Sequence, residues 1–362
     1  MSEEKELGVL RDQIDSLDRK IHELINQRAQ CAQNVAHVKE KYAGGEKIQF
    51  YRPEREAQVL RKVMDRNEGP IADEDMARLF REIMSVCLAL EEPLKVAYLG
   101  PEGTFTQAAA TKHFGHSALC EGQVSIADVF REVEAGSYNY GVVPVENSTE
   151  GVVTHTLDSF AQSNLQISGE VALRIHHHFL TNSDEAQITK VYSHPQSLAQ
   201  CRQWLDTHWA GIERIPVSSN AEAARLAAHE EGAAAIAGDA AAELYGVKQL
   251  ANSIEDMPDN TTRFLIIGKK RTDCSGDDKT SIMVSSKNKP GALYHVLEPF
   301  HQAGVSLTRI ETRPSKAGTW TYNFFIDFEG HSQDKDIAQV LNEISKAVSD
   351  LKILGSYPKA VL

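Results

Sequence analysis

Apolar residues recur at spacings of three and four near the start of the chain, and this period predicts one long helix over residues 7–41. The apolar positions are Leu7, Leu10, Ile14, Leu17, Ile21, Leu24 and Ile25. Two shorter helices are predicted, one after Pro53 and one over residues 73–90. A helix of about 35 residues is roughly 50 Å long. The two shorter helices cannot cover that length, so we expect a second copy of the chain to pack along it in an intertwined dimer.

From Lys95 onward, predicted strands alternate with predicted helices, a pattern typical of α/β layers. The strands are expected over residues 95–99, 141–145, 191–193, 233–237 and 264–267, and the helices over residues 126–135, 197–208 and 220–231. The polar stretch 269–279 predicts a linker.

The last part of the chain has a βαββαβ pattern, which is a ferredoxin-like order. Strands are predicted over residues 280–286, 306–312, 322–328 and 352–354, with helices after Pro290 and over residues 334–348. We therefore expect three domains: an all-α domain over residues 1–92, a two-lobed α/β domain over 93–271 and an α+β domain over 278–357.

Basic residues interrupt the apolar stripe of the long helix. Arg28 and Lys39 share one face, because the residues between them keep spacings of four, three and four. Arg11 lies on a neighbouring part of the stripe. Taken singly, each residue fits an exposed charge or a long side chain that covers apolar surface.

In combination, the residues of this segment resemble the all-helical chorismate mutase family over roughly 90 residues. The matching features are LRDQIDSLD, Arg28, Lys39, RPERE and RLFREIM, in that order. The resemblance implies that chorismate is clamped through its two carboxylates by three arginines, one of them from the partner chain: Arg11, Arg28 and Arg55. It also implies that Lys39 and Glu91 approach the ether oxygen whose bond breaks, and that Glu56 holds the ring hydroxyl. This rearrangement requires only a compact conformer and stabilised charge on that oxygen.

Three positions depart from the mutase pattern. Glu91 stands where the family often has glutamine, Arg52 where an acid often contributes, and Cys87 where a serine does. An ionised carboxylate would repel the ether oxygen, so Glu91 must be protonated to donate a hydrogen bond. We therefore expect mutase activity to fall as the pH rises through the pKa of Glu91.

Four polar clusters follow predicted strands of the α/β segment: GPEGTFTQAA, VVPVENSTEG, YSHPQSLAQC and DNTTRFLIIG. Each alone fits turn and cap chemistry. Ligand sites of α/β proteins form where strands end, so together they predict a site. The first cluster lacks the spacing of a P-loop or a dinucleotide loop, which argues against a nucleotide cofactor.

The GPEGTF, VPVENS, SHPQ and TRF motifs resemble prephenate dehydratase over roughly 175 residues. The resemblance implies two α/β lobes similar to the type 2 periplasmic binding proteins, with the site between them. It makes Thr262 the best candidate for a catalytic group, with Arg263 and Phe264 completing the motif. The residues implied to line the cleft are Glu146, Asn147, Ser148, Gln196 and Ser197, and Thr104 with its glycine turn would bind a carboxylate. We expect Thr262 to orient the departing hydroxyl; whether Glu146 supplies the proton stays open.

The C-terminal domain resembles the ACT domains of prephenate dehydratases, through segments similar to their GALV and ESRP motifs. The residues concerned are Asn288, Gly291, Ala292, Leu293, Glu311, Thr312 and Arg313, and both Tyr294 and Thr312 are substitutions within the pattern. The resemblance implies phenylalanine bound between two such domains, with its carboxylate near the helix start. Feedback inhibition follows if the ligand prefers a less active arrangement.

Composition excludes several other classes of protein. The net charge of −13 argues against nucleic acid, whose phosphates need basic patches, but not against a small anionic substrate. Five scattered cysteines without a CxxC pair favour reduced thiols, and no leader or membrane span is recognisable, so a soluble cytoplasmic protein is expected. The run His176, His177, His178 is not predicted to bind metal, because one ring would face away from the others on a strand.

Taken together, the chain resembles the bifunctional chorismate mutase–prephenate dehydratase family of phenylalanine biosynthesis. The expected function is conversion of chorismate to prephenate and then to phenylpyruvate, inhibited by phenylalanine, in a homodimer or a higher oligomer. A mutase–dehydrogenase fusion would need a Gly-rich dinucleotide loop, and the sequence has none. A binding protein that has lost the chemistry would be favoured by loss of Arg11, Arg28, Lys39 or the TRF motif, and all are present. Activity on arogenate stays open.

Overall fold

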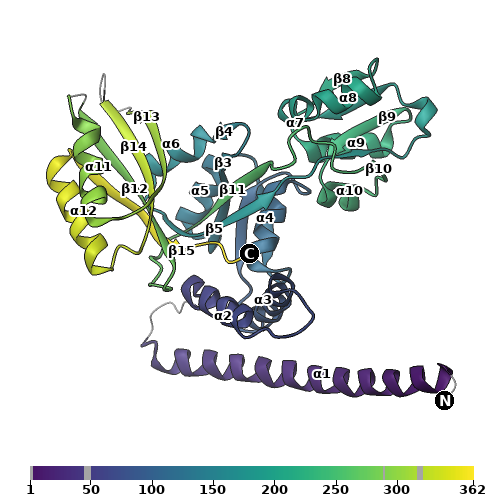
Figure 1. Cartoon of the computed structure of the whole chain (residues 1–362), viewed down its shortest axis with the longest axis horizontal. Helices are drawn as coiled ribbons and strands as arrows, with labels where there is room; N and C mark the ends of the chain where they lie inside the picture. Colours follow the sequence, from purple (N-terminus) through teal and green to yellow (C-terminus); the bar gives the residue numbers. More distant parts are fainter. Residues whose placement is uncertain (1–2, 45–49, 288–289, 316–320) are drawn as a thin grey trace.

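The computed structural model describes residues 3–44, 50–287, 290–315 and 321–362. Figure 1 shows a helical segment below, two α/β lobes in the centre and on one side, and a sheet covered by two helices on the other side. Within the described residues, no helix is long and apolar enough to cross a membrane.

The helical segment consists of α1 (Glu3–Tyr42), α2 (Pro53–Asp65) and α3 (Asp73–Ala89). The predicted helices are confirmed, and α1 begins four residues earlier than its apolar pattern. α1 lies beneath α2 and α3 (Figure 1) and contacts α3, and Ala36 is the only buried residue of this helix in the described part of the chain. α2 and α3 pack against each other, and Leu60 of α2 and Ala77 of α3 are fully buried.

The first lobe is a mixed sheet of order β2-β1-β3-β11-β5, with β4 paired to β3. Its strands are β1 (Lys95–Leu99), β2 (Leu119–Gln123), β3 (Tyr140–Asn147), β4 (Gly151–Val152), β5 (Gln166–Arg174) and β11 (Thr261–Gly268). Its helices are α4 (Phe105–Phe114), α5 (Ile126–Ala135) and α6 (Thr154–Gln162). β11 returns from the second lobe and pairs antiparallel with both β3 and β5.

The second lobe is a sheet of order β10-β6-β9-β7-β8. Its strands are β6 (His178–Leu180), β7 (Lys190–Ser193), β8 (Glu213–Pro216), β9 (Ala233–Ala237) and β10 (Gln249–Ala251). Its helices are α7 (Pro195–Gln200), α8 (Arg202–His208), α9 (Asn220–His229) and α10 (Asp239–Tyr245).

The single helix predicted over residues 197–208 is wrong, because the chain breaks at Cys201 into α7 and α8. The Asp256 carboxylate accepts hydrogen bonds from the backbone N–H groups of Gln203 and Trp204. It thereby caps the start of α8, and a carboxylate at a helix N-terminus is favourable. This cap comes from a segment more than 50 positions away, so local sequence does not reveal it.

The C-terminal domain has the predicted βαββαβ order, with a sheet of order β13-β14-β12-β15. Its elements are β12 (Asp278–Lys287), α11 (Ala292–Ala303), β13 (Leu307–Pro314), β14 (Thr321–Glu329), α12 (Lys335–Ala347) and β15 (Asp350–Pro358). β15 is longer than the predicted strand because it also packs along β5 of the first lobe. At Gly355 a Cβ atom would lie 2.3 Å from the Ile167 carbonyl oxygen, so only glycine allows this approach.

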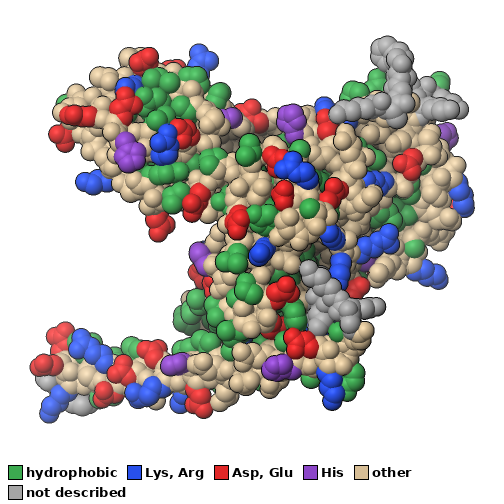
Figure 2. Space-filling view, turned by 180° about the vertical axis from the view of Figure 1, so that it is seen from behind, with side chains coloured by type: hydrophobic (Ala, Val, Ile, Leu, Met, Phe, Trp, Pro, Cys, Tyr) green, Lys and Arg blue, Asp and Glu red, His purple; other side chains and the backbone are tan. Residues whose placement is uncertain are grey.

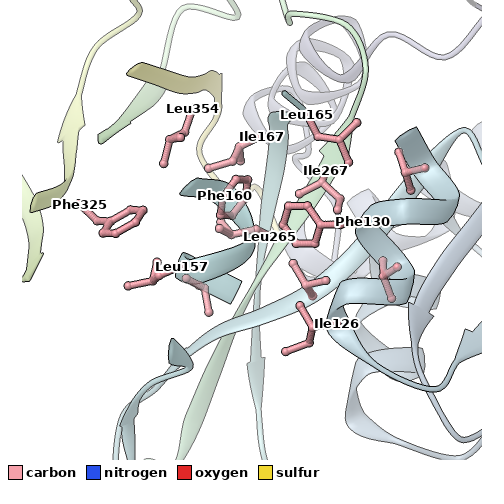
Figure 3. Packing of buried hydrophobic residues seen from close by; sticks show 14 of the residues in the cluster. Ile126, Phe130, Leu157, Phe160, Leu165, Ile167, Leu265, Ile267, Phe325 and Leu354 are labelled. Carbon is pink, nitrogen blue, oxygen red and sulfur yellow. The ribbon is translucent and has the colours of Figure 1, made fainter. Parts of the chain in front are cut away.

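The C-terminal domain and the first lobe share one hydrophobic core. Figure 3 shows Phe325 and Leu354 beside Leu157, Phe160 and Ile167 of the first lobe. All five side chains are buried. The C-terminal domain is therefore fixed against the lobe by apolar packing and does not hang from a free linker.

The linker itself is bound by the helical segment. Arg61 of α2 donates to the carbonyl oxygens of Ser275 and Asp277, and Arg52 pairs with Asp273. The three parts of the chain therefore meet at one junction.

Candidate functional site

The predicted mutase residues Lys39 and Glu91 lie near each other. Lys39 lies near the end of α1, and its Nζ atom is 3.5 Å from the Phe50 carbonyl oxygen. Partial burial raises the pKa of Glu91, and the nearby charge of Lys39 opposes that rise. The raised pKa favours the protonated form that a hydrogen bond to an ether oxygen requires.

The predicted arginine clamp is not assembled within one chain. Arg11 and Arg55 are exposed, and Arg28 is half-buried on α1. The N-terminal part of α1 projects from the rest of the chain in Figure 2. Its apolar stripe lies open, with Leu17 55% and Leu24 63% exposed. An exposed apolar stripe of this kind marks an interaction surface.

Glu56 and Arg52 already have partners in this chain. Glu56 Oε1 lies 3.3 Å from Nε of buried Arg81, and burial raises the pKa of Glu56 against the opposing effect of Arg81. Arg52 pairs with Glu54 as well as with the linker, and Cys87 is buried. These contacts assign Arg52 to the junction of the domains.

In the α/β domain, Thr262 is held by an asparagine of the predicted ENS motif. Asn147 Nδ2 donates to Thr262 Oγ1 at 2.8 Å and to Asn260 Oδ1 at 2.8 Å. The orientation of this amide is fixed, because Asn147 Oδ1 accepts the backbone N–H groups of Thr149 and Glu150. Only an oxygen can accept both bonds, so the nitrogen must face Thr262.

The same reasoning extends into the second lobe. Since Asn260 Oδ1 accepts from Asn147, Asn260 Nδ2 donates to Gln200 Oε1 at 3.0 Å. Gln200 Nε2 in turn donates to Thr149 Oγ1 at 3.0 Å. His177 Nε2 lies 2.9 Å from Gln200 Oε1 and must therefore be the N–H donor. We call Asn147, Thr149, Gln200, Asn260 and His177 the amide relay.

The relay decides what the Thr262 hydroxyl can do. Its oxygen accepts a bond from Asn147, and a hydroxyl that accepts in this way can still donate its own proton to a ligand. Burial lowers the pKa of His177 and keeps the ring neutral near pH 7. Its Nδ1 atom has no hydrogen-bond partner among the described residues. The arrangement can hold and polarise a hydroxyl leaving group in front of Thr262.

Two residues predicted beside Thr262 face the C-terminal domain instead. Arg263 Nε lies 2.8 Å from Glu170 Oε2, and its Nη1 lies 2.6 Å from Asp327 Oδ2. Glu146 Oε2 lies 3.2 Å from Arg309 Nε. Side chains alternate along a strand, which separates Thr262 from Arg263 and Asn147 from Glu146. The structure therefore does not bring Arg263 or Glu146 together with Thr262.

The remaining predicted residues of the cleft have structural contacts. Phe264 is 2% exposed within the core of the first lobe. Ser148 Oγ accepts from the Thr261 backbone N–H and joins the two loops. Buried Ser197 accepts from Asn220, while Gln196 is half-buried on α7. The Thr104 hydroxyl donates to the Pro101 carbonyl oxygen at 2.9 Å.

The loop that carries Thr104 reaches the second lobe. A Cβ atom on Gly103 would lie 3.3 Å from Ala241 Cα, and the ring of Phe105 lies against Gly238 and His177. This loop therefore helps to position one lobe against the other.

Thr149, Gln200 and Asn260 lie within the polar clusters found in the sequence, but they were not predicted as site residues. His177 was considered only as a metal ligand. The available signal was the density of amide side chains within the motifs. The three histidines bind different partners: His176 pairs with Glu255, His177 with Gln200, and His178 accepts from Ser253. Across the described residues there is no group of three or more metal-binding side chains.

The predicted effector residues lie at the exposed edge of the C-terminal domain. Gly291 has a left-handed φ of 79° at the start of α11, and Leu293 and Tyr294 are exposed. Arg313 of edge strand β13 pairs with Asp158 of α6 at 2.9 Å, and Glu311 and Thr312 lie beside it in sequence. Asn288 lies outside the described residues.

Comparison with known proteins assigns each part of the chain. Residues 10–92 match the family Chorismate mutase type II, residues 96–272 match Prephenate dehydratase, and residues 280–346 match the ACT domain. The chain is 61% identical to a bifunctional chorismate mutase/prephenate dehydratase of Stutzerimonas stutzeri and 60% identical to one of Pseudomonas aeruginosa, each over 100% of both chains. The chain belongs to the bifunctional chorismate mutase/prephenate dehydratase family.

A solved structure agrees with this family assignment. A prephenate dehydratase from Arthrobacter aurescens, in complex with L-Phe, is 33% identical and has a TM-score of 0.69. The match covers 73% of this chain and 90% of that one. The amide relay lies in the part of this chain that matches prephenate dehydratase. Helix α1 lies in the part that matches chorismate mutase.

Proposed function

We propose that this chain converts chorismate to prephenate in its helical domain and prephenate to phenylpyruvate in its α/β domain, and that phenylalanine inhibits it through the ACT domain. Full-length identity of 61% to a bifunctional relative supports both activities. The five cysteines are free thiols, which fits a reducing compartment such as the cytoplasm.

The mutase site forms between two copies of the chain. The exposed apolar stripe of α1 is buried against the partner, which brings Arg11 of one chain toward Arg28 and Lys39 of the other. Arg11, Arg28 and Arg55 bind the two carboxylates of chorismate and hold its compact conformer. Lys39 and protonated Glu91 stabilise the charge that develops on the ether oxygen. The nearness of Lys39 and Glu91 supports this assignment.

The dehydratase reaction breaks the ring C–O bond and expels CO₂, while aromatisation of the ring drives it. Thr262 donates its free proton as a hydrogen bond to the departing hydroxyl and so helps it leave. The carboxylates of prephenate bind near the glycine turn at Thr104, where the start of α4 favours anions. Asn147 keeps Thr262 in the donating orientation, and Gln196 and Ser197 lie on the wall of the second lobe. The Asn147–Thr262 bond of 2.8 Å is the observation that carries this proposal.

Phenylalanine binds between two ACT domains, where the start of α11 and alternate residues of the edge strand β13 are exposed. Gly291, Ala292 and Leu293 contact its carboxylate and side chain, and Glu311, Thr312 and Arg313 line the opposite side. A ligand that binds the less active arrangement more tightly lowers dehydratase activity.

Prephenate supplied alone tests the dehydratase assignment. The wild-type chain is expected to form phenylpyruvate, and Thr262→Val, which keeps the shape of the side chain without its hydroxyl, is expected to lose at least 100-fold in kcat. Unchanged mutase activity in the same preparation is the folding control. Full dehydratase activity in Thr262→Val would contradict the assigned role.

A further inference from the structure

Two motif residues of the dehydratase domain face the ACT domain. Glu146 and Arg263 are cross-strand partners on β3 and β11. Their next neighbours in sequence, Asn147 and Thr262, make the hydrogen bond that orients the catalytic hydroxyl. Each motif therefore presents one residue to the reaction and one to the neighbouring domain.

Two residues of the ACT domain, one basic and one acidic, contact Glu146 and Arg263. Arg309 and Asp327 are cross-strand partners on β13 and β14. Arg309 Nε lies 3.2 Å from Glu146 Oε2, and Asp327 Oδ2 lies 2.6 Å from Arg263 Nη1. We call these four residues the ionic square. Its two acids and two bases balance in charge, and Glu170, which also pairs with Arg263, is itself paired with Lys279. Arg309 and Asp327 are only 7% and 6% exposed, while Glu146 is 39% exposed.

The square lies close to the effector motif. Arg309, Glu311 and Arg313 alternate along β13, so their side chains share the face that lies toward the first lobe, and this face is less exposed than the other. Arg313 fixes the far end of that face to Asp158. A movement of β13 at Glu311–Arg313 is therefore transmitted to Arg309, which lies two residues away.

Arg309 is incompletely bonded in this arrangement. Its Nε and Nη2 atoms are buried and have no well-directed hydrogen bond among the described residues. Buried donors without partners are unfavourable, and a small shift of β13 would change how they meet Glu146 and Asp327. We therefore expect the square to adopt a second arrangement with different bonding when β13 moves, which is what coupling between sites requires.

We propose that the ionic square couples phenylalanine occupancy to the dehydratase site, an inference that rests on the proposed function. When the effector displaces β13, Arg309 and Asp327 act on Glu146 and Arg263. The Arg263–Asp327 pair is largely buried, so separating it is strongly unfavourable, whereas Glu146 is 39% exposed and is held more weakly by Arg309. The ends of β3 and β11 follow, and Asn147 and Thr262 move apart. A displacement of about 1 Å at a catalytic group costs on the order of 100-fold in rate.

Arg309→Met tests the coupling, because methionine keeps apolar length and removes the charge. Prephenate turnover and its inhibition by phenylalanine are measured, together with phenylalanine binding by calorimetry. We expect kcat without phenylalanine within threefold of wild type, a phenylalanine Kd within threefold, and an inhibitory concentration raised at least tenfold. Lys346→Met, which breaks an exposed pair with Glu343 on α12 of the same domain, is the matched control and should behave as wild type.

A variant of Asp327, the other ACT residue of the square, tests the coupling if Arg309→Met does not fold. Asp327→Asn keeps the side-chain shape and removes the other ACT charge, and it is expected to weaken inhibition in the same way. Wild-type inhibition in a folded variant overturns the coupling, and so does lost inhibition that arises from lost phenylalanine binding. A wild-type chain that makes no phenylpyruvate overturns the proposed function, and the coupling with it.

Discussion

In the proposed mutase site, the protonation of one side chain, Glu91, controls the reaction. Its pKa is raised by burial, which extends the protonated form to higher pH. Only that form donates to the ether oxygen, so mutase kcat/KM is expected to be highest below the pKa and to fall about tenfold for each pH unit above it.

Glu91→Gln supplies the same donor at every pH. We expect its mutase kcat/KM to be nearly flat between pH 5 and 9 and to exceed that of wild type at the alkaline end. The measurement is chorismate consumption across that range. A Gln variant that keeps the wild-type pH profile would contradict the role of Glu91.

His177 contacts Gln200 of the amide relay, and we expect it to act on the dehydratase reaction through that contact. Loss of its hydrogen bond frees the Gln200 amide to rotate and loosens the orientation of Thr262. We expect His177→Leu to lower dehydratase kcat about tenfold, the equivalent of one hydrogen bond of about 1.4 kcal/mol, with little change in KM.

His177→Gln carries an N–H donor at a similar reach and should recover most of that loss. The mutase activity of both variants serves as the control for folding. Equal losses in the Leu and Gln variants would show that the histidine matters for packing alone.

Sequence motifs gave the candidate site residues but not the direction of each side chain. Thr262 and Asn147 were predicted together and are bonded together. Alternation along β11 and β3 already separated them from Arg263 and Glu146, but the partners of those two residues could not be inferred. Asp327 and Arg309 belong to another domain, 64 and 163 positions further along the chain from Arg263 and Glu146.

At the scale of elements, the spacing of apolar residues and the positions of glycine and proline predicted most helices and strands. α1, α5 and β9 follow from local pattern, because the two helices keep apolar spacings of three and four and β9 is a short continuous apolar run. The break between α7 and α8 and the length of β15 depend on Asp256 and β5, which are distant in sequence. Tertiary contacts therefore decided the boundaries that local pattern missed.

The open face of α1 makes a prediction about assembly. Leu24 is 63% exposed, and Leu24→Glu would place a charge in the proposed dimer interface at a cost of several kcal/mol. We expect this variant to be monomeric by light scattering and to lose at least tenfold in mutase kcat/KM. Prephenate turnover should persist, because the amide relay lies within one chain.

Val124→Glu is the matched control for this assembly test. Val124 is 95% exposed beside α5 and away from α1, so its substitution should leave both mass and activity unchanged. A dimeric, fully active Leu24→Glu chain would contradict the intertwined arrangement.

At the scale of the whole molecule, the three parts are joined by physical contacts as well as by the chain. β15 pairs with β12, packs along β5 and reaches α2. The shared core of Figure 3 and the ionic square join the ACT domain to the first lobe, and Arg61 ties the helical segment to the linker. These contacts join the domains for the two consecutive reactions and the regulatory domain into one molecule.

The most direct test of this account is the formation of phenylpyruvate from chorismate by the purified chain, with and without phenylalanine. The account predicts that phenylpyruvate forms without any added enzyme and that phenylalanine suppresses its formation. Accumulation of prephenate without phenylpyruvate would contradict the account, because it would leave the mutase alone active and the α/β domain a binding protein.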